Sequence, residues 1–300
     1  MNSLKTYIEE NNLGKILSEV SLKNYNTYKI DATTKLLFIP SSIDNLIDSL
    51  KYIKEHEIRY LILGKGSNLI FNFDIFDGVI ISLEKLNEVN INDTIIKVGA
   101  GYPLIKLAME TAALGLSGLE FASGIPGTLG GAIYMNAGAY KSDMSSVVKE
   151  ISVLTPDFKI KTLTNEELEF GYRNSFLKHN KDFIVLDVTL ELTHGIKEEI
   201  LNIINERAKK RKESQPLEYP SAGSVFRNPE NDYAGRLIEE QGFKGMNING
   251  AEVSTKHANF IINADSCKGS DIVELINKIQ ESIKKEYDIN LILEQEIIEK

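Results

Sequence analysis

The chain has 300 residues, which is enough for two domains of roughly 150 residues each. Its 34 Lys and Arg against 43 Asp and Glu give a net charge of −9, which argues against non-specific binding to nucleic acid or to an acidic membrane. The single cysteine, Cys267, excludes an intrachain disulfide and a multi-cysteine metal site, and it suits a reducing compartment. Neither a signal peptide nor an apolar run of the ~18 residues that a membrane helix needs is visible, so we expect a cytoplasmic protein. His56, His179 and His194 show no mutual spacing that suggests a metal site, so we expect no metal.

Short strands alternate with helices along the chain, which predicts an α+β fold. Ser41 and Ser42 should cap a helix whose apolar residues follow a 3-4 spacing from Ile43, and Pro103 should start a helix that stops at Gly115. Further helices are expected at 196–213, 233–241 and 270–286. Strands are expected at 36–40, 60–63, 79–83, 94–99, 183–192, 259–264 and 289–298, with a hairpin across Pro156-Asp157.

The glycine-rich run Gly64-Lys65-Gly66-Ser67-Asn68 follows the predicted strand at 60–63. Glycines allow positive φ, so that successive N–H groups can converge on one anion. The run is neither a Walker A loop nor the dinucleotide-binding G-x-G-x-x-G pattern, since position 69 is leucine. Taken alone, it fits an anion-binding loop and an ordinary hairpin turn equally well.

A second glycine-rich track covers residues 123–140, where small residues run almost without interruption. Backbone at such residues can lie directly against a flat, extended ligand and donate hydrogen bonds to it. Close packing of a helix on a sheet is the alternative explanation for several of these glycines. Two loops of this kind with few charges suit a dinucleotide whose diphosphate is held mainly by backbone.

Five motifs together resemble one enzyme family. They are LGKGSNLI (63–70), ASGIPGTLGGAIYMNAGAY (122–140), YRNS (172–175), AGSVFRNP (222–229) and TKHANFIIN (255–263). In this order they are similar to the UDP-N-acetylenolpyruvoylglucosamine reductase (UDP-N-acetylmuramate dehydrogenase) family, in its shorter type, because no long tyrosine-bearing insertion lies between Phe176 and Asp182. The resemblance covers about residues 20–296, and one departure is Lys141, where the family commonly has glycine.

The resemblance implies an FAD-binding fold of the vanillyl-alcohol-oxidase (PCMH) type, followed by an α+β substrate-binding domain. We therefore expect an FAD-binding domain at 1–195 with α+β subdomains at about 1–80 and 81–195, a linker helix at 196–215, and a substrate domain at 216–300 whose last strand returns to the active site. The resemblance also implies a role in peptidoglycan precursor synthesis, as part of cell-wall biogenesis. We expect a monomer that binds a small UDP-sugar and neither nucleic acid nor membrane.

The implied reaction reduces an enolpyruvyl ether to a lactyl ether. NADPH reduces FAD, and the reduced flavin gives a hydride to the methylene carbon of the substrate. Non-covalent FAD is expected because neither glycine motif contains His or Cys. The site must then stabilise the negative charge that develops next to the carboxylate and deliver one proton to the adjacent carbon.

Arg173 suits the first task, because a guanidinium offers a permanent charge and a fork that matches a carboxylate. Ser224 suits the second task, because a serine hydroxyl can protonate a very basic carbon. The alternatives are an ordinary salt bridge for Arg173 and a turn cap for Ser224. Glu294, on the expected last strand, is the third predicted catalytic residue, since a buried carboxyl could stay protonated and donate to the enolate. Glu296 would face the same side, so spacing leaves both open, and the resemblance selects Glu294.

The other site residues follow from the motif positions. Five basic residues within 207–212 either attract the phosphates of the two ligands or form a solvated helix face, and His257 is either a ligand contact or a structural residue. The substrate-binding residues are expected to be Tyr172, Lys212, Gln215, Asn228 and Lys256. The cofactor-binding residues are expected to be Gly64, Lys65, Gly66, Ser67, Asn68, Leu69, Ser123, Gly124, Ile125, Pro126, Gly127, Gly130, Gly131, Asn136, Gly138, Ala139 and Tyr140.

Two other functions are compatible with part of this pattern. An oxidase of the same flavin fold would act on an alcohol or hydroxy acid and would be reoxidised rapidly by dioxygen. A non-catalytic flavin- or nucleotide-binding module is disfavoured because the predicted catalytic set is complete. The sequence therefore favours the NADPH- and FAD-dependent reductase.

Overall fold

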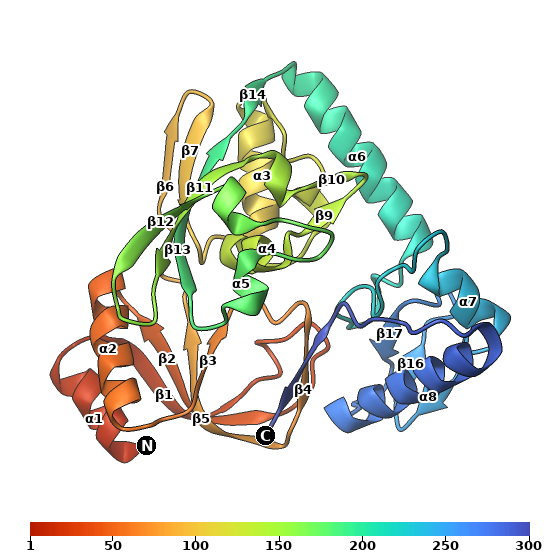
Figure 1. Ribbon diagram of the computed structural model, residues 1–300, viewed down its shortest axis with the longest axis horizontal. Coiled ribbons are helices and arrows are strands. Elements are labelled where there is room, and N and C mark those ends of the chain that lie inside the picture. Colours follow the sequence, from red (N-terminus) through yellow and green to blue (C-terminus); the bar gives the residue numbers. More distant parts are fainter. The chain divides into compact units, whose positions relative to one another are not determined.

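The structure is a computed structural model that describes residues 1–300 (Figure 1). Contacts within the chain divide it into two compact units. The first unit consists of Met1–Ser18, Leu36–Lys65 and Gly78–Lys209, and the second consists of Glu19–Lys35, Gly66–Asp77 and Lys210–Lys300. The predicted domain boundaries differ from this division, because the second unit includes two segments from the predicted 1–195 domain.

A mixed sheet with the strand order β1-β2-β5-β3 is built from the first third of the chain. Helix α2 (Ile43–Glu55) forms as predicted, because the Ser42 hydroxyl accepts a hydrogen bond from the Asn45 N–H at 3.1 Å and the apolar face of the helix is buried. It packs against α1 (Asn2–Glu10), which the sequence did not predict. The strands are Gly14–Ser21 (β1), Thr33–Pro40 (β2), Tyr60–Leu63 (β3) and Ile75–Ser82 (β5), with β3 and β5 parallel.

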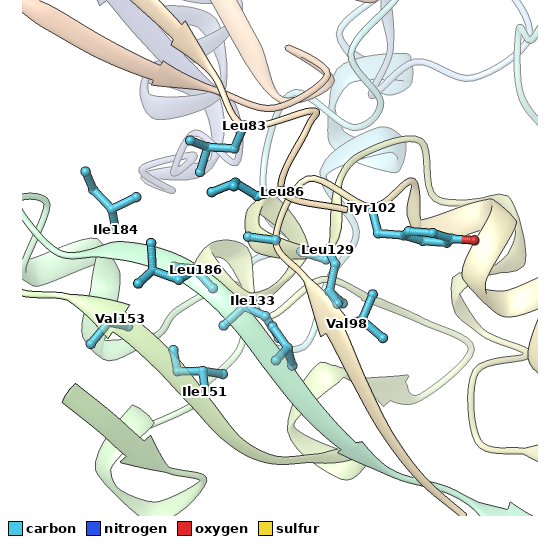
Figure 2. Close-up of a cluster of buried hydrophobic side chains, with 14 of the residues drawn as sticks. Leu83, Leu86, Val98, Tyr102, Leu129, Ile133, Ile151, Val153, Ile184 and Leu186 are labelled. Atoms are coloured by element: carbon cyan, nitrogen blue, oxygen red, sulfur yellow. The ribbon is translucent and has the colours of Figure 1, made fainter. Parts of the chain in front are cut away.

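The core of the first unit lies against a five-stranded antiparallel sheet with the order β12-β11-β13-β7-β6. Helix α4 (Leu129–Met135) packs on this sheet. Figure 2 shows Leu129 and Ile133 of α4 among Val98, Ile151 and Leu186 of the sheet, all buried, and each such side chain stabilises the fold by roughly 1.5–3 kcal/mol. The strands are Val89–Asn92 (β6), Ile95–Gly99 (β7), Val148–Leu154 (β11), Ile160–Thr164 (β12) and Ile184–Glu191 (β13).

Several predicted elements of this unit are confirmed. The hairpin across Pro156 joins β11 and β12, and helix α3 (Leu104–Ala113) follows Pro103, which is its N-cap. Gly115 adopts φ +73° directly after the helix, as a C-terminal glycine does. The smaller elements are β8 (Leu116–Ser117), β9 (Gly138–Ala139), β10 (Ser142–Asp143), β14 (Thr193–His194), α5 (Phe176–His179) and short 3-10 helices at Ala122–Gly124, Met144–Ser146 and Glu166–Leu168.

Helix α6 (Lys197–Ser214) is the predicted charged helix, and the division between the two units falls within it. Only Ile200 and Ile204 of this helix are buried, and they pack against Ala112 of α3. The low apolar content of α6 follows from this narrow contact, because a helix needs only the buried stripe to be apolar. None of the helices has both the length and the apolar character that crossing a membrane requires.

The second unit combines a three-stranded antiparallel sheet, a parallel strand pair and two helices. Helix α8 (Gly269–Tyr287) buries one apolar face, from Ile272 to Ile283, against the sheet. Helix α7 (Ala234–Glu240) packs against α8 and ends before Gly242, which adopts φ +73°. The strands are Asn247–Ile248 (β15), Ala251–Val253 (β16) and Ile261–Asn263 (β17), and Leu69–Asn72 (β4) pairs in parallel with Glu296–Glu299 (β18).

The last strand is shorter than predicted. Of the expected strand 289–298, only its end lies in β18, which begins at Glu296, so Glu294 lies before the strand and not on it. The preceding segment forms one isolated antiparallel bridge, between Leu293 and Phe226, and Ile292 is 61% exposed. The prediction failed because β18 has only β4 as a partner, and β4 begins opposite Glu296.

Candidate active site

The first glycine-rich run forms the connection from β3 to β4. Gly64 is exposed, and a β-carbon on it would lie 2.6 Å from the Thr128 hydroxyl oxygen. Thr128 belongs to the second glycine-rich track and caps α4, so the first unit brings the end of β3 against that track. Gly66 adopts φ +59°, and a β-carbon there would lie 2.3 Å from the Tyr25 carbonyl oxygen. Glycine is required at position 66 for both its conformation and its packing, which confirms the expected positive-φ turn.

The rest of this run is tied to the chain's own backbone in the second unit. The Asn68 amide donates to the Glu294 carbonyl oxygen at 2.9 Å, and the Asn68 carbonyl accepts from the Glu296 N–H at 2.9 Å. Asn68, a predicted cofactor residue, therefore holds the segment that carries Glu294. Ser67 and Leu69 are half-buried, and Lys65, in the first unit, is exposed.

The second track is only partly extended. Residues 129–135 form α4, and the Gly130 N–H donates to the Ala100 carbonyl at 2.8 Å, while a β-carbon on Gly130 would lie 3.0 Å from the Ala100 β-carbon. Gly130 therefore serves close packing of the helix, which is the alternative explanation given above for several of these glycines. Its neighbours Ser123, Gly124, Ile125 and Gly127 are half-buried and Pro126 is exposed.

Asn136 ends α4 in a left-handed conformation with φ +42°. Its buried side chain donates to the Gly171 carbonyl at 2.9 Å and accepts from the Ser145 N–H at 3.0 Å. Asn136, a predicted cofactor residue, therefore joins the glycine-rich track to the segment just before Tyr172. Asparagine suits this position because its short amide tolerates positive φ.

Arg173 lies beside the same track. Its Nη2 donates to the Gly138 carbonyl at 2.8 Å, and its guanidinium lies 5.2 Å from the centroid of the half-exposed Tyr172 ring. Arg173 itself adopts φ +53°, a conformation that costs a non-glycine residue roughly 1–2 kcal/mol. The first unit thus places the predicted catalytic guanidinium against Gly138 of the predicted cofactor-binding set.

Part of the glycine-rich track is open to a ligand. A β-carbon at the exposed Gly131 would meet only the Thr128 hydroxyl, at 3.5 Å, so the backbone here is open on one side. Gly138 and Ala139 are half-buried and lie next to the guanidinium of Arg173. The N–H groups of Gly130 and Gly131 are bonded within the chain, so residues 123–131 with 138–140 would hold FAD by close approach of glycine-rich backbone beside the Arg173 cation. His, Cys, Asp and Glu side chains nowhere gather in a group of three that could hold a metal ion.

Ser224 and Glu294 lie on two segments of the second unit that pair with each other. The Glu294 N–H donates to the Val225 carbonyl at 2.9 Å, and the Arg227 N–H donates to the Ile292 carbonyl at 2.9 Å. Both Ser224 and Glu294 are half-buried. The structure therefore pairs the backbone segments that carry these two residues, which lie 70 positions apart in the sequence (294 − 224).

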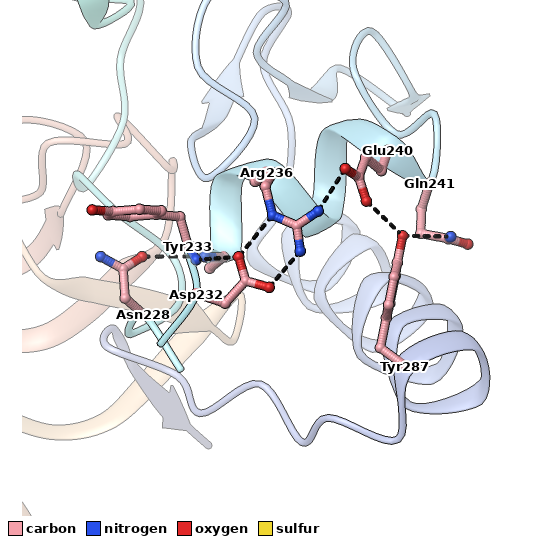
Figure 3. Close-up of polar contacts among 8 residues, drawn as sticks. Asn228, Asp232, Tyr233, Arg236, Glu240, Gln241 and Tyr287 are labelled. Atoms are coloured by element: carbon pink, nitrogen blue, oxygen red, sulfur yellow. Dashed lines mark hydrogen bonds and ion pairs between the residues drawn. The ribbon is translucent and has the colours of Figure 1, made fainter. Parts of the chain in front are cut away.

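The predicted substrate residues of the second unit make local contacts. The Asn228 side chain accepts from the Ala234 N–H at 3.1 Å and so helps to cap α7 (Figure 3). Lys256 donates to the Lys212 carbonyl at 2.6 Å, and Gln215 accepts from Arg211 at 3.0 Å. The ammonium of Lys256 is thereby held near the carboxyl-terminal end of α6, where Lys212 lies.

His257 serves the structure in at least one way. Its Nδ1 accepts from the Asn259 N–H at 3.2 Å, and its ring lies 4.8 Å from that of Phe260. Burial, assisted by the positive charge of Lys244, lowers the pKa of His257, so the ring is neutral at physiological pH. This matches the structural explanation of the residue.

Two buried amides near Ser224 were not predicted. The Asn259 side chain accepts from the Phe226 N–H at 3.0 Å and donates to the Phe226 carbonyl at 2.8 Å. Gln295 donates to the carbonyls of Ala222 and Gly223. Asn259 lies in the TKHANFIIN motif, and Gln295 directly follows Glu294. The sequence alone does not tell whether such an amide side chain is buried in a structural role or exposed to solvent.

Comparisons with known proteins settle the family. Residues 215–298 match the family model for the C-terminal domain of UDP-N-acetylenolpyruvoylglucosamine reductase, and residues 34–164 match a model for an FAD-binding domain. The chain is 42% identical over 299 residues to the UDP-N-acetylenolpyruvoylglucosamine reductase of Anoxybacillus flavithermus, covering 99% of each chain. The chain belongs to the UDP-N-acetylenolpyruvoylglucosamine reductase family. It is therefore an FAD-dependent oxidoreductase.

Other members of the reductase family agree. The Bacillus subtilis reductase is 40% identical over 292 residues, covering 97% of this chain and 96% of that one. The crystal structure of the reductase from Thermus caldophilus matches with a TM-score of 0.82 and 34% identity, over 95% of this chain and 99% of that one. A glucose dehydrogenase, Phl p 4.0202, matches 65% of this chain with a TM-score of 0.50 and 13% identity, and it shares the fold alone. The predicted FAD-binding fold of the vanillyl-alcohol-oxidase type is thus confirmed.

Proposed function

We propose that the protein reduces the enolpyruvyl ether of UDP-N-acetylenolpyruvoylglucosamine to a lactyl ether, which gives UDP-N-acetylmuramate for peptidoglycan synthesis, with NADPH as the reductant. The backbone pairing of the Ser224 turn with the Glu294 segment carries this proposal, because it joins within one unit the two segments that carry the expected proton donor and the expected carboxyl. Family membership supports the choice of substrate. FAD, when bound, supplies the hydride that adds to the methylene carbon of the enolpyruvyl group.

Side chains of the protein stabilise the developing negative charge and deliver the proton. When the hydride adds, the electron pair of the double bond moves to the adjacent carbon, which is conjugated with the carboxylate. Arg173 stabilises the negative charge on that carboxylate through its guanidinium. The Ser224 hydroxyl then donates its proton to the carbon, and solvent returns a proton to the serine oxygen. Glu294, on the segment that pairs with the Ser224 turn, is the third residue that acts on this carboxylate.

A spectroscopic experiment tests this function. The purified protein should be yellow, should bleach with NADPH under anaerobic conditions, and should regain colour when the enolpyruvyl sugar nucleotide is added. Ser224→Ala should bleach normally but recover about 100- to 10,000-fold more slowly. Ser221→Ala, in the same turn, is the matched control and should recover at the wild-type rate.

Each alternative has its own outcome in this experiment. Rapid recovery with dioxygen but not with the sugar nucleotide would indicate an oxidase. A protein that binds flavin but is not bleached by NADPH would indicate a non-catalytic module. Recovery of Ser224→Ala at a near-normal rate would remove Ser224 from the mechanism while leaving the substrate assignment intact.

A further inference from the structure

The turn that carries Ser224 is open on one side. Gly223 adopts φ +77°, and a β-carbon built on it would meet no atom within 4 Å. Packing around Gly223 therefore does not fix the turn, and hydrogen bonds to its backbone must do so. The Phe226 backbone, two residues beyond Ser224, is held on both sides by the Asn259 side chain. The residues before Ser224 need a separate anchor.

Gln295 is that anchor. Its Nε2 donates to the Ala222 carbonyl at 3.1 Å and to the Gly223 carbonyl at 3.2 Å. Its Oε1 accepts from the Tyr28 hydroxyl at 3.0 Å. Gln295 is only 3% exposed and Tyr28 is fully buried, so these bonds are shielded from water. Burial raises the pKa of Tyr28, which keeps its phenol protonated and able to donate.

A carboxamide is the side-chain group that satisfies all three hydrogen-bond partners of Gln295. Two carbonyl oxygens need donors and one hydroxyl needs an acceptor, and glutamine supplies two N–H bonds and one oxygen from a single planar group. A carboxylate of the same size would set an oxygen against the two carbonyls. A thioether would leave both carbonyls and the phenol unpaired in a buried place, which is costly.

Gln295 is also the next residue after Glu294. Both residues lie in a bend directly before β18, so the bonds of Gln295 fix the backbone immediately next to Glu294. One amide therefore ties the Ser224 turn to the Glu294 segment. The Glu294 carbonyl also accepts a hydrogen bond from the Asn68 side chain. This bond fixes the backbone at Glu294 but does not involve the Ser224 turn.

We propose that Gln295 is a positioning residue that holds the Ser224 hydroxyl and the Glu294 carboxyl in the arrangement needed for protonation of the substrate carbon. This inference rests on the proposed function. Gln295 acts through the turn and not on the substrate, so it should matter for recovery of the flavin with the sugar nucleotide and not for its bleaching by NADPH.

Two variants of Gln295 and one control separate positioning from stability. Gln295→Met removes all three hydrogen bonds, and Gln295→Glu keeps the size and the acceptor but loses the donors at mildly alkaline pH. Asn26→Leu is the matched control, because the Asn26 amide is 2% exposed, donates to the Leu22 and Ile30 carbonyls and accepts from the Ile30 N–H, and none of these hydrogen bonds goes to the Ser224 turn.

We expect both Gln295 variants to slow flavin recovery by the sugar nucleotide about 100-fold, the loss that a misplacement of about 1 Å produces. Bleaching by NADPH should change less than about twofold, and Asn26→Leu should leave both steps near the wild-type rates. In the protein without FAD or substrate, amide hydrogen exchange at residues 222–225 should speed up in the Gln295 variants and stay unchanged in Asn26→Leu.

The outcomes that overturn the proposal differ from those that overturn the function. Wild-type recovery rates in Gln295→Met, while Ser224→Ala remains slow, would refute the positioning role and leave the function intact. Equal losses of bleaching and recovery in the Gln295 variants would show a general structural role instead. A wild-type protein that the sugar nucleotide does not reoxidise would remove the proposed function itself.

Discussion

Arg207 stacks on Tyr140, with its guanidinium 4.7 Å from the centroid of the tyrosine ring. The Tyr140 hydroxyl donates to the Arg207 carbonyl at 3.1 Å, so the two residues are joined twice. This pair connects α6 to the end of the glycine-rich track within the first unit. One of the five basic residues at 207–212 is therefore engaged by an aromatic ring and is not simply a solvated charge.

Arg207→Ala should lower the free energy of unfolding by about 0.5–1 kcal/mol, the usual value of a partly exposed cation–π contact. Arg207→Lys, which keeps the charge, should lose less. Urea unfolding followed by circular dichroism measures both. An alanine variant as stable as the wild type would show that this contact contributes nothing to the fold.

Lys141→Gly should stabilise the protein. Lys141 adopts φ +62°, directly after Tyr140 at φ +55°, and a left-handed conformation costs a residue with a β-carbon about 1–2 kcal/mol. Since glycine also gains freedom in the unfolded chain, the net gain should be at most about 1 kcal/mol. Lys141→Val should be destabilising instead. Thermal melting of the two variants and the wild type shows whether each substitution raises or lowers the stability.

Arg173→Lys keeps the positive charge but loses the planar fork that matches a carboxylate. Flavin recovery with the sugar nucleotide should slow about 100-fold or more, as for other residues that stabilise developing charge. Bleaching by NADPH should persist. Stopped-flow absorbance measures both steps, and equal slowing of the two would point to damage of the flavin site, since Arg173 also donates to Gly138.

The flavin should be held without a covalent bond, because residues 64–70 and 122–140 contain neither His nor Cys. Acid or heat precipitation should therefore release all of the yellow colour into the supernatant. Absorbance spectra of the supernatant and of the redissolved pellet measure the two fractions. Colour that stays with the washed pellet would contradict the prediction.

The Cys267 thiol should be unreactive in the folded protein. It is 3% exposed, and burial raises its pKa to about 12. Because the folded pKa lies above the unfolded one, its contribution to stability is complete below about pH 8.5 and is lost as pH rises toward 12. Alkylation by iodoacetamide should require unfolding, and Cys267→Ala should flatten the decline of stability above pH 8.5. Rapid labelling of the native protein at neutral pH would show that the thiol is accessible.

Local signals were enough to predict the strongly patterned elements. Helix α2 has a serine cap and a regular apolar face, and α8 has an apolar residue at nearly every position that faces its sheet. Both are long enough for the period to be clear. The fold class and the hairpin across Pro156 followed from the same kind of pattern.

Helix α4 could not be predicted in this way, because its sequence LGGAIYM contains two glycines, each of which disfavours a helix by about 1 kcal/mol. The helix forms because its surroundings compensate. The Thr128 hydroxyl accepts from the Gly131 N–H at 3.4 Å, and Gly130 packs directly on Ala100. These contacts are tertiary, so no local sequence pattern predicts them.

The predicted catalytic residues came from motifs, and the structure adds what holds two of them. Ser224 and Glu294 are placed by backbone pairing and by Gln295, none of which is visible in a single sequence. The extended apolar pattern of LILEQEII suggested one long strand, whereas only Glu296–Glu299 finds a partner. The site residues themselves stay predictions until the variants are measured.

Parallel pairing of β4 with β18 joins positions that are 227 residues apart, and the Tyr28–Gln295 bond closes an even longer loop. Closing such loops costs entropy that only late tertiary contacts repay, so this unit should be the slower one to assemble. An excised fragment that begins near residue 215 would lack both partners. Dissection of this enzyme for crystallisation or labelling should therefore cut elsewhere, or supply residues 19–35 and 66–77 in trans.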